Sequence, residues 1–98
     1  MSVVVVARWK GDWQKAMPIV KEVPSFLKEH GAVSARAGTC YSGPHAGDIY
    51  TAVTFPHWEA FGRGHGALTT DPQIKKTYAE GMQIIEVQDR SIMAMEDL

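Results

Sequence analysis

The fold of this chain is decided near its N-terminus, by the stretch Val3-Val4-Val5-Val6-Ala7-Arg8-Trp9. A continuous run of β-branched residues is typical of a strand that is covered on both faces. We therefore expect one face of this strand to pack on helices and the other to need a second cover. The run is too short for a membrane span, which takes about 20 apolar residues. It also lacks the basic segment and the cleavage site of a signal peptide.

A helical pattern follows the first strand. Asp12 is a suitable N-cap, and apolar residues then recur at spacings of three and four from Trp13 to Leu27. Two prolines interrupt this pattern, with Pro18 expected near the first turn and Pro24 inside. Because proline removes a backbone donor and clashes with the preceding turn, the sequence predicts a kinked or two-part helix. Gly31 is then a natural C-terminal residue.

The remaining segments predict a hairpin, two helices and a last strand. Residues 32–41 and 49–55 alternate in polarity, and the turn-rich segment 42–48 joins them. Helices are expected over residues 56–69 and 72–80, the second capped by Asp71 with Pro72 at its first position. The final strand is expected over residues 82–95, with a bend or bulge at 89–91.

This order of elements indicates an α+β fold. Strand, helix, strand, strand, helix pair and strand give the ferredoxin-like βαββαβ arrangement, a four-stranded antiparallel sheet with helices on one face. We expect residues 1–98 to form one domain. The other sheet face would leave Val4, Val6 and Ile84 open, and such apolar faces normally mark an interface. A second copy is the simplest cover, so the sequence predicts a homodimer in which two sheets form an α/β barrel.

Composition narrows the classes of partner. The formal net charge is -1 and no basic run is present, so a nucleic-acid partner is not expected. Cys40 is the only cysteine, and no CxxC or Cys/His cluster suggests a metal site. These features, with no targeting signal, favour a cytoplasmic protein that does not bind membranes.

Over essentially its whole length the chain resembles the dimeric α/β-barrel superfamily, which includes antibiotic-biosynthesis-monooxygenase-like, EthD-like and stress-responsive domains. The resemblance is carried by segments 3–9, 43–47 and 55–61, and by Leu68 followed by Asp71-Pro72. It implies cofactor-independent oxygenation, cyclisation or isomerisation of a hydrophobic, aromatic or polyketide-like small molecule, and some relatives bind haem. The asparagine that some monooxygenase relatives use has no counterpart here, because the chain contains no asparagine.

Candidate ligand-binding residues follow from the alternation of the strands. If Val3, Val5, Ala7 and Trp9 face the helices, the barrel side receives Arg8, Arg36, Tyr50 and Glu86. We expect Arg36 to hold an organic anion and Tyr50 to donate a hydrogen bond. The alternative is that an Arg–Glu pair neutralises itself in the barrel, since buried charges are usually paired.

The helix over residues 56–69 carries the candidate base. His65 shares one helical stripe with Trp58, Phe61 and Leu68, and an imidazole exchanges protons near neutral pH. Three alternating glycines, Gly62, Gly64 and Gly66, surround His65, and each costs a helix about 1 kcal/mol relative to alanine. Either a close approach offsets that cost, or the segment is an irregular lid over the pocket.

Two other functions stay open from the sequence. The chain could be a non-catalytic binding or stress-response module in which these charges are structural. Haem binding through His65 or His45 is the third possibility. No metal-ligand spacing is present, and a core or backbone-bonded role for His65 is the structural alternative to catalysis.

Overall fold

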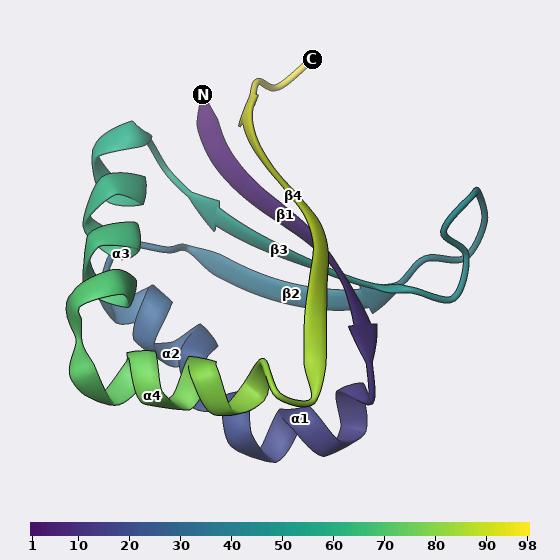
Figure 1. Cartoon of the computed structure of the whole chain (residues 1–98). Coiled ribbons are helices and arrows are strands. Elements are labelled where there is room, and N and C mark those ends of the chain that lie inside the picture. Colours follow the sequence, from purple (N-terminus) through teal and green to yellow (C-terminus); the bar gives the residue numbers. More distant parts are fainter.

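The computed structural model describes residues 1–98 and shows eight elements (Figure 1). Along the chain, one strand is followed by a pair of helices, two strands, a second pair of helices and a last strand. Their bounds are β1 Ser2–Gly11, α1 Trp13–Val20, α2 Glu22–Glu29, β2 Ser34–Thr39, β3 Ile49–Phe55, α3 Trp58–Thr70, α4 Pro72–Gly81 and β4 Ile85–Met95. No helix is both long enough and apolar enough to cross a membrane.

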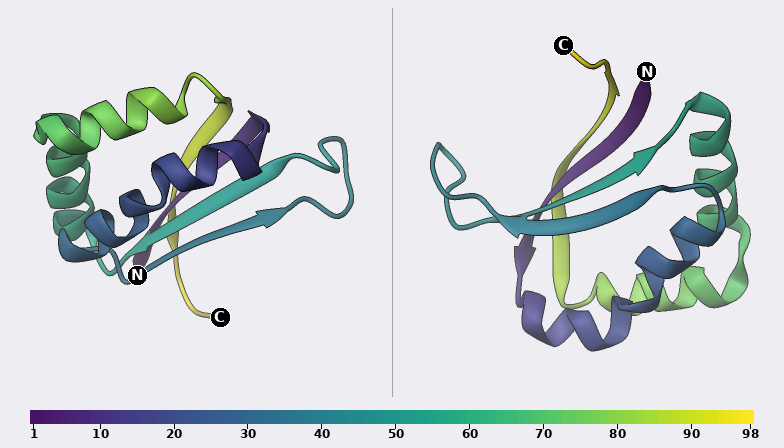
Figure 2. Two further views of the ribbon diagram at one scale, coloured as in Figure 1. Left: turned by 90° about the horizontal axis from the view of Figure 1, so that it is seen from below. Right: turned by 180° about the vertical axis from the view of Figure 1, so that it is seen from behind.

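The strands form one antiparallel sheet in the order β2-β3-β1-β4. All four helices lie on one side of this sheet, as the two further views show (Figure 2). The predicted ferredoxin-like α+β fold is therefore confirmed. The β2–β3 hairpin extends beyond the sheet, and the two chain ends lie side by side (Figures 1 and 2).

Alternation along β1 sorts its side chains between the two faces. Val3, Ala7 and Trp9 are buried against the helices, as expected. They belong to two neighbouring core clusters, one around Phe55 and Leu27 and the other including Ala16 and Ile85. The even-numbered residues of β1, including Arg8, lie on the opposite face, which we call the outer face.

Local signals determine the ends of the helices. The Asp12 carboxylate accepts a hydrogen bond from the Lys15 amide at 3.0 Å, and the Asp71 carboxylate caps α4 in the same way. The predicted two-part helix is present, but the prolines have exchanged roles. Pro18 lies inside α1, whereas Pro24 lies in the first turn of α2, where its missing amide hydrogen is no loss.

The last strand begins later than expected and contains a bulge. Residues 82–84 form a turn after α4, so Ile84 lies outside the strand. Arg8 pairs with Asp89 whereas Trp9 pairs with Val87, which leaves Gln88 as an extra residue. The predicted irregularity is thus present, one residue before the expected segment.

The glycine-rich segment forms a regular helix, α3, rather than an irregular lid. A Cβ on Gly64 would lie 2.5 Å from Phe55 Cε1, so Gly64 permits the close approach of α3 to β3. Gly62 and Gly66 have no neighbour within 4 Å of such an atom. Nothing in the structure explains these two glycines.

Candidate functional site

A cavity with a volume of about 500 Å³ lies between the sheet and the helices. Of its 25 lining residues 18 are hydrophobic, so it suits an apolar ligand. The expectation was a cavity on the outer face, and the structure differs from it.

Phe55, Phe61 and His65 line one part of this cavity. The rings of Phe55 and Phe61 meet edge to face at a centroid distance of 5.6 Å. The imidazole of His65 stacks on Phe61 at 5.7 Å with an interplanar angle of 18°. The apolar neighbour predicted for His65 is therefore in contact with it, and the imidazole has access to the cavity.

Trp9, Trp13 and Tyr78 line another part of the cavity. The Trp9 ring lies 6.5 Å from Trp13 and 6.4 Å from Tyr78. Its indole nitrogen donates a 2.9 Å hydrogen bond to Thr51 Oγ1. This bond orients the indole, so aromatic rings line this part of the cavity.

The polar residues of this second part include Tyr78 and Arg90, of which Arg90 is exposed overall, together with Thr51, Gln88 and Asp89. The chain's three ion pairs involve Arg8 and Arg63, so Arg90 has none. The Tyr78 hydroxyl has no hydrogen-bond partner in the chain. Burial raises the pKa of Tyr78, and the nearby charge of Arg90 opposes this effect. Two unpartnered donors at an apolar cavity can bind an oxygen acceptor or an organic anion.

The two polar parts are separated along β1. Phe55, which packs on Phe61, lies opposite Val3, whereas Arg90 lies opposite Ala7, four residues further on. This corresponds to about 13 Å at the usual rise of a strand. His65 and Arg90 can therefore address different ends of one extended ligand.

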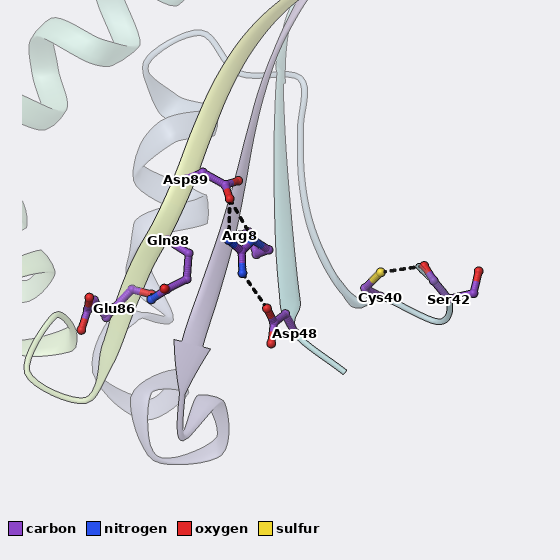
Figure 3. A network of polar contacts seen from close by, with 7 residues as sticks. All are labelled: Arg8, Cys40, Ser42, Asp48, Glu86, Gln88 and Asp89. Carbon is purple, nitrogen blue, oxygen red and sulfur yellow. Dashed lines mark hydrogen bonds and ion pairs between the residues drawn. The ribbon is translucent and has the colours of Figure 1, made fainter. Parts of the chain in front are cut away.

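Arg8 lies outside the cavity, in an ion-pair network on the outer face (Figure 3). Its guanidinium lies 2.8 Å from Asp48 Oδ2 and 2.7 Å from Asp89 Oδ2. Hydrogen bonds with Asp48 and then Asp89 raise the pKa of Arg8, and the bond from Arg8 lowers the pKa of Asp48. The expected pairing of an arginine with a glutamate is wrong, because the bulge brings Asp89 opposite Arg8.

The other expected residues are distributed differently around the molecule. Tyr50 lies on the outer face opposite Arg8, and Glu86 is exposed opposite Lys10. Arg36 contributes to the cavity rim, although alternation in β2 directs its exposed side chain outward. Trp58 is exposed and packs edge to face on Phe61 at 5.9 Å. Of the expected set, Phe61 and His65 lie together in the cavity, Trp58 packs on Phe61 outside its lining, and Arg36 lies at the rim.

Sequence reasoning missed Tyr78 and Arg90. Tyr78 lies one helical turn from both Ile74 and Met82, and this apolar stripe could have indicated that it faces the sheet. Arg90 had no such signal, because strict alternation from Ile85 and Val87 would place it on the outer face. Only the bulge turns it toward the helices.

Comparison with solved structures identifies the fold. SnoaB from Streptomyces nogalater, a cofactor-independent oxygenase, superposes with a TM-score of 0.73 at 11% identity, over 99% of this chain and 95% of that chain. Rv0793 from Mycobacterium tuberculosis superposes with a TM-score of 0.70 at 13% identity, over 100% of this chain and 98% of that chain. A NIPSNAP family protein from Agrobacterium tumefaciens also superposes with a TM-score of 0.70 at 13% identity, over 99% of this chain and 95% of that chain.

The chain shares its ferredoxin-like fold with these solved structures, and with a putative antibiotic biosynthesis monooxygenase from Chloroflexus aurantiacus. This agrees with the resemblance noted in the sequence. Neither the family models nor the curated proteins contain a match. At these identities the likeness concerns the fold, and the function must be argued from the cavity.

Proposed function

We propose that this chain binds an apolar, ring-bearing organic anion in the cavity between sheet and helices and acts on it as a cofactor-independent enzyme. The observation that carries the proposal is the composition of the cavity. Its lining is mainly hydrophobic, yet Arg90 and Tyr78 have no partners in the chain and His65 reaches it from α3. A polycyclic aromatic or polyketide-like ligand matches both properties.

The proposed chemistry begins with removal of a proton by His65. An acidic ring CH₂ that is conjugated with a carbonyl through aromatic rings gives an enolate, and conjugation spreads its charge across the fused rings. Arg90 and Tyr78 stabilise that charge through an oxygen at the other end. Their roles replace those first assigned to Arg36 and Tyr50.

Oxygenation, isomerisation and cyclisation can all start from such an enolate. In oxygenation the substrate supplies the electrons to O₂. The CH₂ group becomes a carbonyl, one oxygen atom enters the product, and the other leaves as water. The fold shared with SnoaB, a cofactor-independent oxygenase, supports oxygenation among the three reactions.

A tricyclic anthrone is a suitable probe, because it has an acidic CH₂ between two aromatic rings and a carbonyl opposite. We expect wild-type protein to increase its oxygen consumption, and His65→Ala to reduce this rate at least about a hundredfold, as loss of a general base does. His45→Ala is the matched control, since His45 is an exposed residue of the hairpin loop. Equal rates for His65→Ala and wild type would remove His65 as the base.

A non-catalytic binding module is the alternative function. It shares the cavity and the proposed ligand class but has no turnover. Tight anthrone binding by wild-type protein, with no oxygen consumption and no isomerised or cyclised product, would favour it.

We also propose that a second copy covers the outer face. Val4 and Val6 on β1 lie there, together with the exposed side chains of Met93 and Met95 on β4. Apolar side chains gathered on one sheet face support a sheet-to-sheet homodimer.

A further inference from the structure

The bulge in β4 divides that strand into two halves with different alternation. Before Gln88, the helix-facing residues are Ile85 and Val87. After it, the helix-facing residues are the even-numbered ones, beginning with Arg90 opposite Ala7. Arg90 therefore faces the cavity only while the bulge stays at Gln88.

Hydrophobic burial does not determine the alternation of the second half. Ile92 faces the helices and is 46% exposed, whereas Met93 faces outward and is 40% exposed. A shift by one residue would exchange these two positions with little change in buried apolar area. Such strands have a weakly specified register and can slip.

The alternative register is defined by the first half of β4. If the pairing of Trp9 with Val87 continued without a bulge, Ala7 would face Asp89 and Val6 would face Arg90. Asp89 would then lie beside the buried Ala7 on the apolar face, and Arg90 would lie on the outer face.

The interaction that separates the two registers is the ion pair between Arg8 and Asp89. Arg8 Nε donates a 2.8 Å charge-assisted hydrogen bond to Asp89 Oδ2, and Nη2 forms an ion pair with the same oxygen at 2.7 Å (Figure 3). The Arg8 side chain is only 11% exposed, and Asp48 holds its other end at 2.8 Å. A fixed guanidinium thus determines where Asp89 lies.

We propose that Arg8 and Asp89 form a clamp that holds the bulge at Gln88 and thereby positions Arg90 in the cavity. Arg8 is then a positioning residue that acts on a ligand it does not touch. The expected effect on anion binding rests on the proposed function of Arg90. The expected effect on the pairing register of β1 and β4 does not.

Binding of two matched dyes tests the consequence for the ligand. Anilinonaphthalene sulfonate and N-phenylnaphthylamine share an aromatic body, but only the first carries an anionic group. We expect Asp89→Ala to weaken sulfonate binding about tenfold and to leave the neutral dye within about twofold. The direction is diagnostic, because removing a nearby negative charge would strengthen anion binding if Arg90 stayed in place.

Two variants serve as controls for the dye experiment. Asp48→Ala removes the same charge from Arg8 but leaves its contact with Asp89, so sulfonate binding should persist. Arg90→Gln should reproduce the loss seen in Asp89→Ala. If Arg90→Gln has no effect, the anion-binding role fails, and the register experiment still decides the clamp.

The register itself is measured by nuclear Overhauser contacts between β1 and β4. Wild-type protein should show Arg8 opposite Asp89, whereas Asp89→Ala should show contacts of Arg8 with Gln88. Asp89→Asn, which keeps the side-chain volume, repeats the test if the alanine variant does not fold. An unchanged register in the folded variant, or tighter sulfonate binding, would overturn the proposal.

Discussion

Arg8 and Asp89 lie opposite one another on β1 and β4, with 2.7 Å between Arg8 Nη2 and Asp89 Oδ2. The bulge begins at the next residue pair, so this ion pair on the outer face adjoins the turn that directs Arg90 to the helix side. The ion pair between Arg8 and Asp89 on the outer face is thus connected with the position of Arg90 on the helix side of the same sheet.

The titration of Tyr78 should report the position of Arg90. Burial raises the pKa of Tyr78 above its ordinary value of 10.0, and the Arg90 charge opposes that rise. Arg90→Gln should therefore raise the pKa of Tyr78 further. Ultraviolet titration of tyrosinate measures this pKa. Because the chain has three tyrosines, the Tyr78→Phe variant identifies the part of the signal that comes from Tyr78. An unchanged Tyr78 titration would mean that Arg90 lies away from it.

The Arg8–Asp48 pair should contribute to stability in a pH-dependent way. Arg8 lowers the pKa of Asp48 below its ordinary value of 3.8, so the contribution is complete above this pH. This contribution to stability is lost as the pH falls from 3.8 through the lower pKa that Asp48 has in the folded state. The reason is that Asp48 takes up its proton at a higher pH in the unfolded chain than in the folded one. Asp48→Asn should be less stable than wild type at neutral pH.

The difference in the free energy of unfolding between wild type and Asp48→Asn should disappear at acidic pH. Urea unfolding at neutral pH and at pH values on either side of 3.8 checks this. Asp97→Asn, at an exposed position near the C-terminus, is the control and should match wild type throughout. A constant difference at all pH values would contradict the assigned pair.

Alanine at Gly64 and at Gly62 should change stability in opposite directions. A Cβ at Gly64 would meet the Phe55 ring at 2.5 and 2.9 Å, so Gly64→Ala should destabilise the fold by about 1–3 kcal/mol. Gly62 has open space and should gain about 1 kcal/mol from helix propensity. Urea midpoints measure both, and equal midpoints would count against the close packing of α3 on β3.

A charge on the outer face should dissociate the proposed homodimer. Val6 lies opposite Ala52 and Ser91 on that face. Burying an unpaired carboxylate is unfavourable, so Val6→Glu should halve the mass seen by light scattering. Gln14→Glu, on the exposed surface of α1, should leave the mass unchanged. A monomeric wild type would refute the dimer itself.

The sequence by itself determined the features that depend on neighbours in the chain. Alternation along residues 3–9 divided the side chains of this strand into two sets on opposite faces, because successive side chains of a strand point to opposite sides. Asp12, Asp71 and Gly31 marked helix ends, since capping needs only nearby backbone groups. The stripe that contains Phe61 and His65 was predictable for the same reason.

Tertiary structure alone decided which face carries the cavity and which acid pairs with Arg8. Both depend on residues far apart in the sequence, as Arg8 and Asp89 are. A single extra residue, Gln88, reverses the alternation of everything that follows it in β4. Arg90 consequently faces the helices, which no periodic pattern in the sequence encodes, because the bulge depends on a contact between two strands.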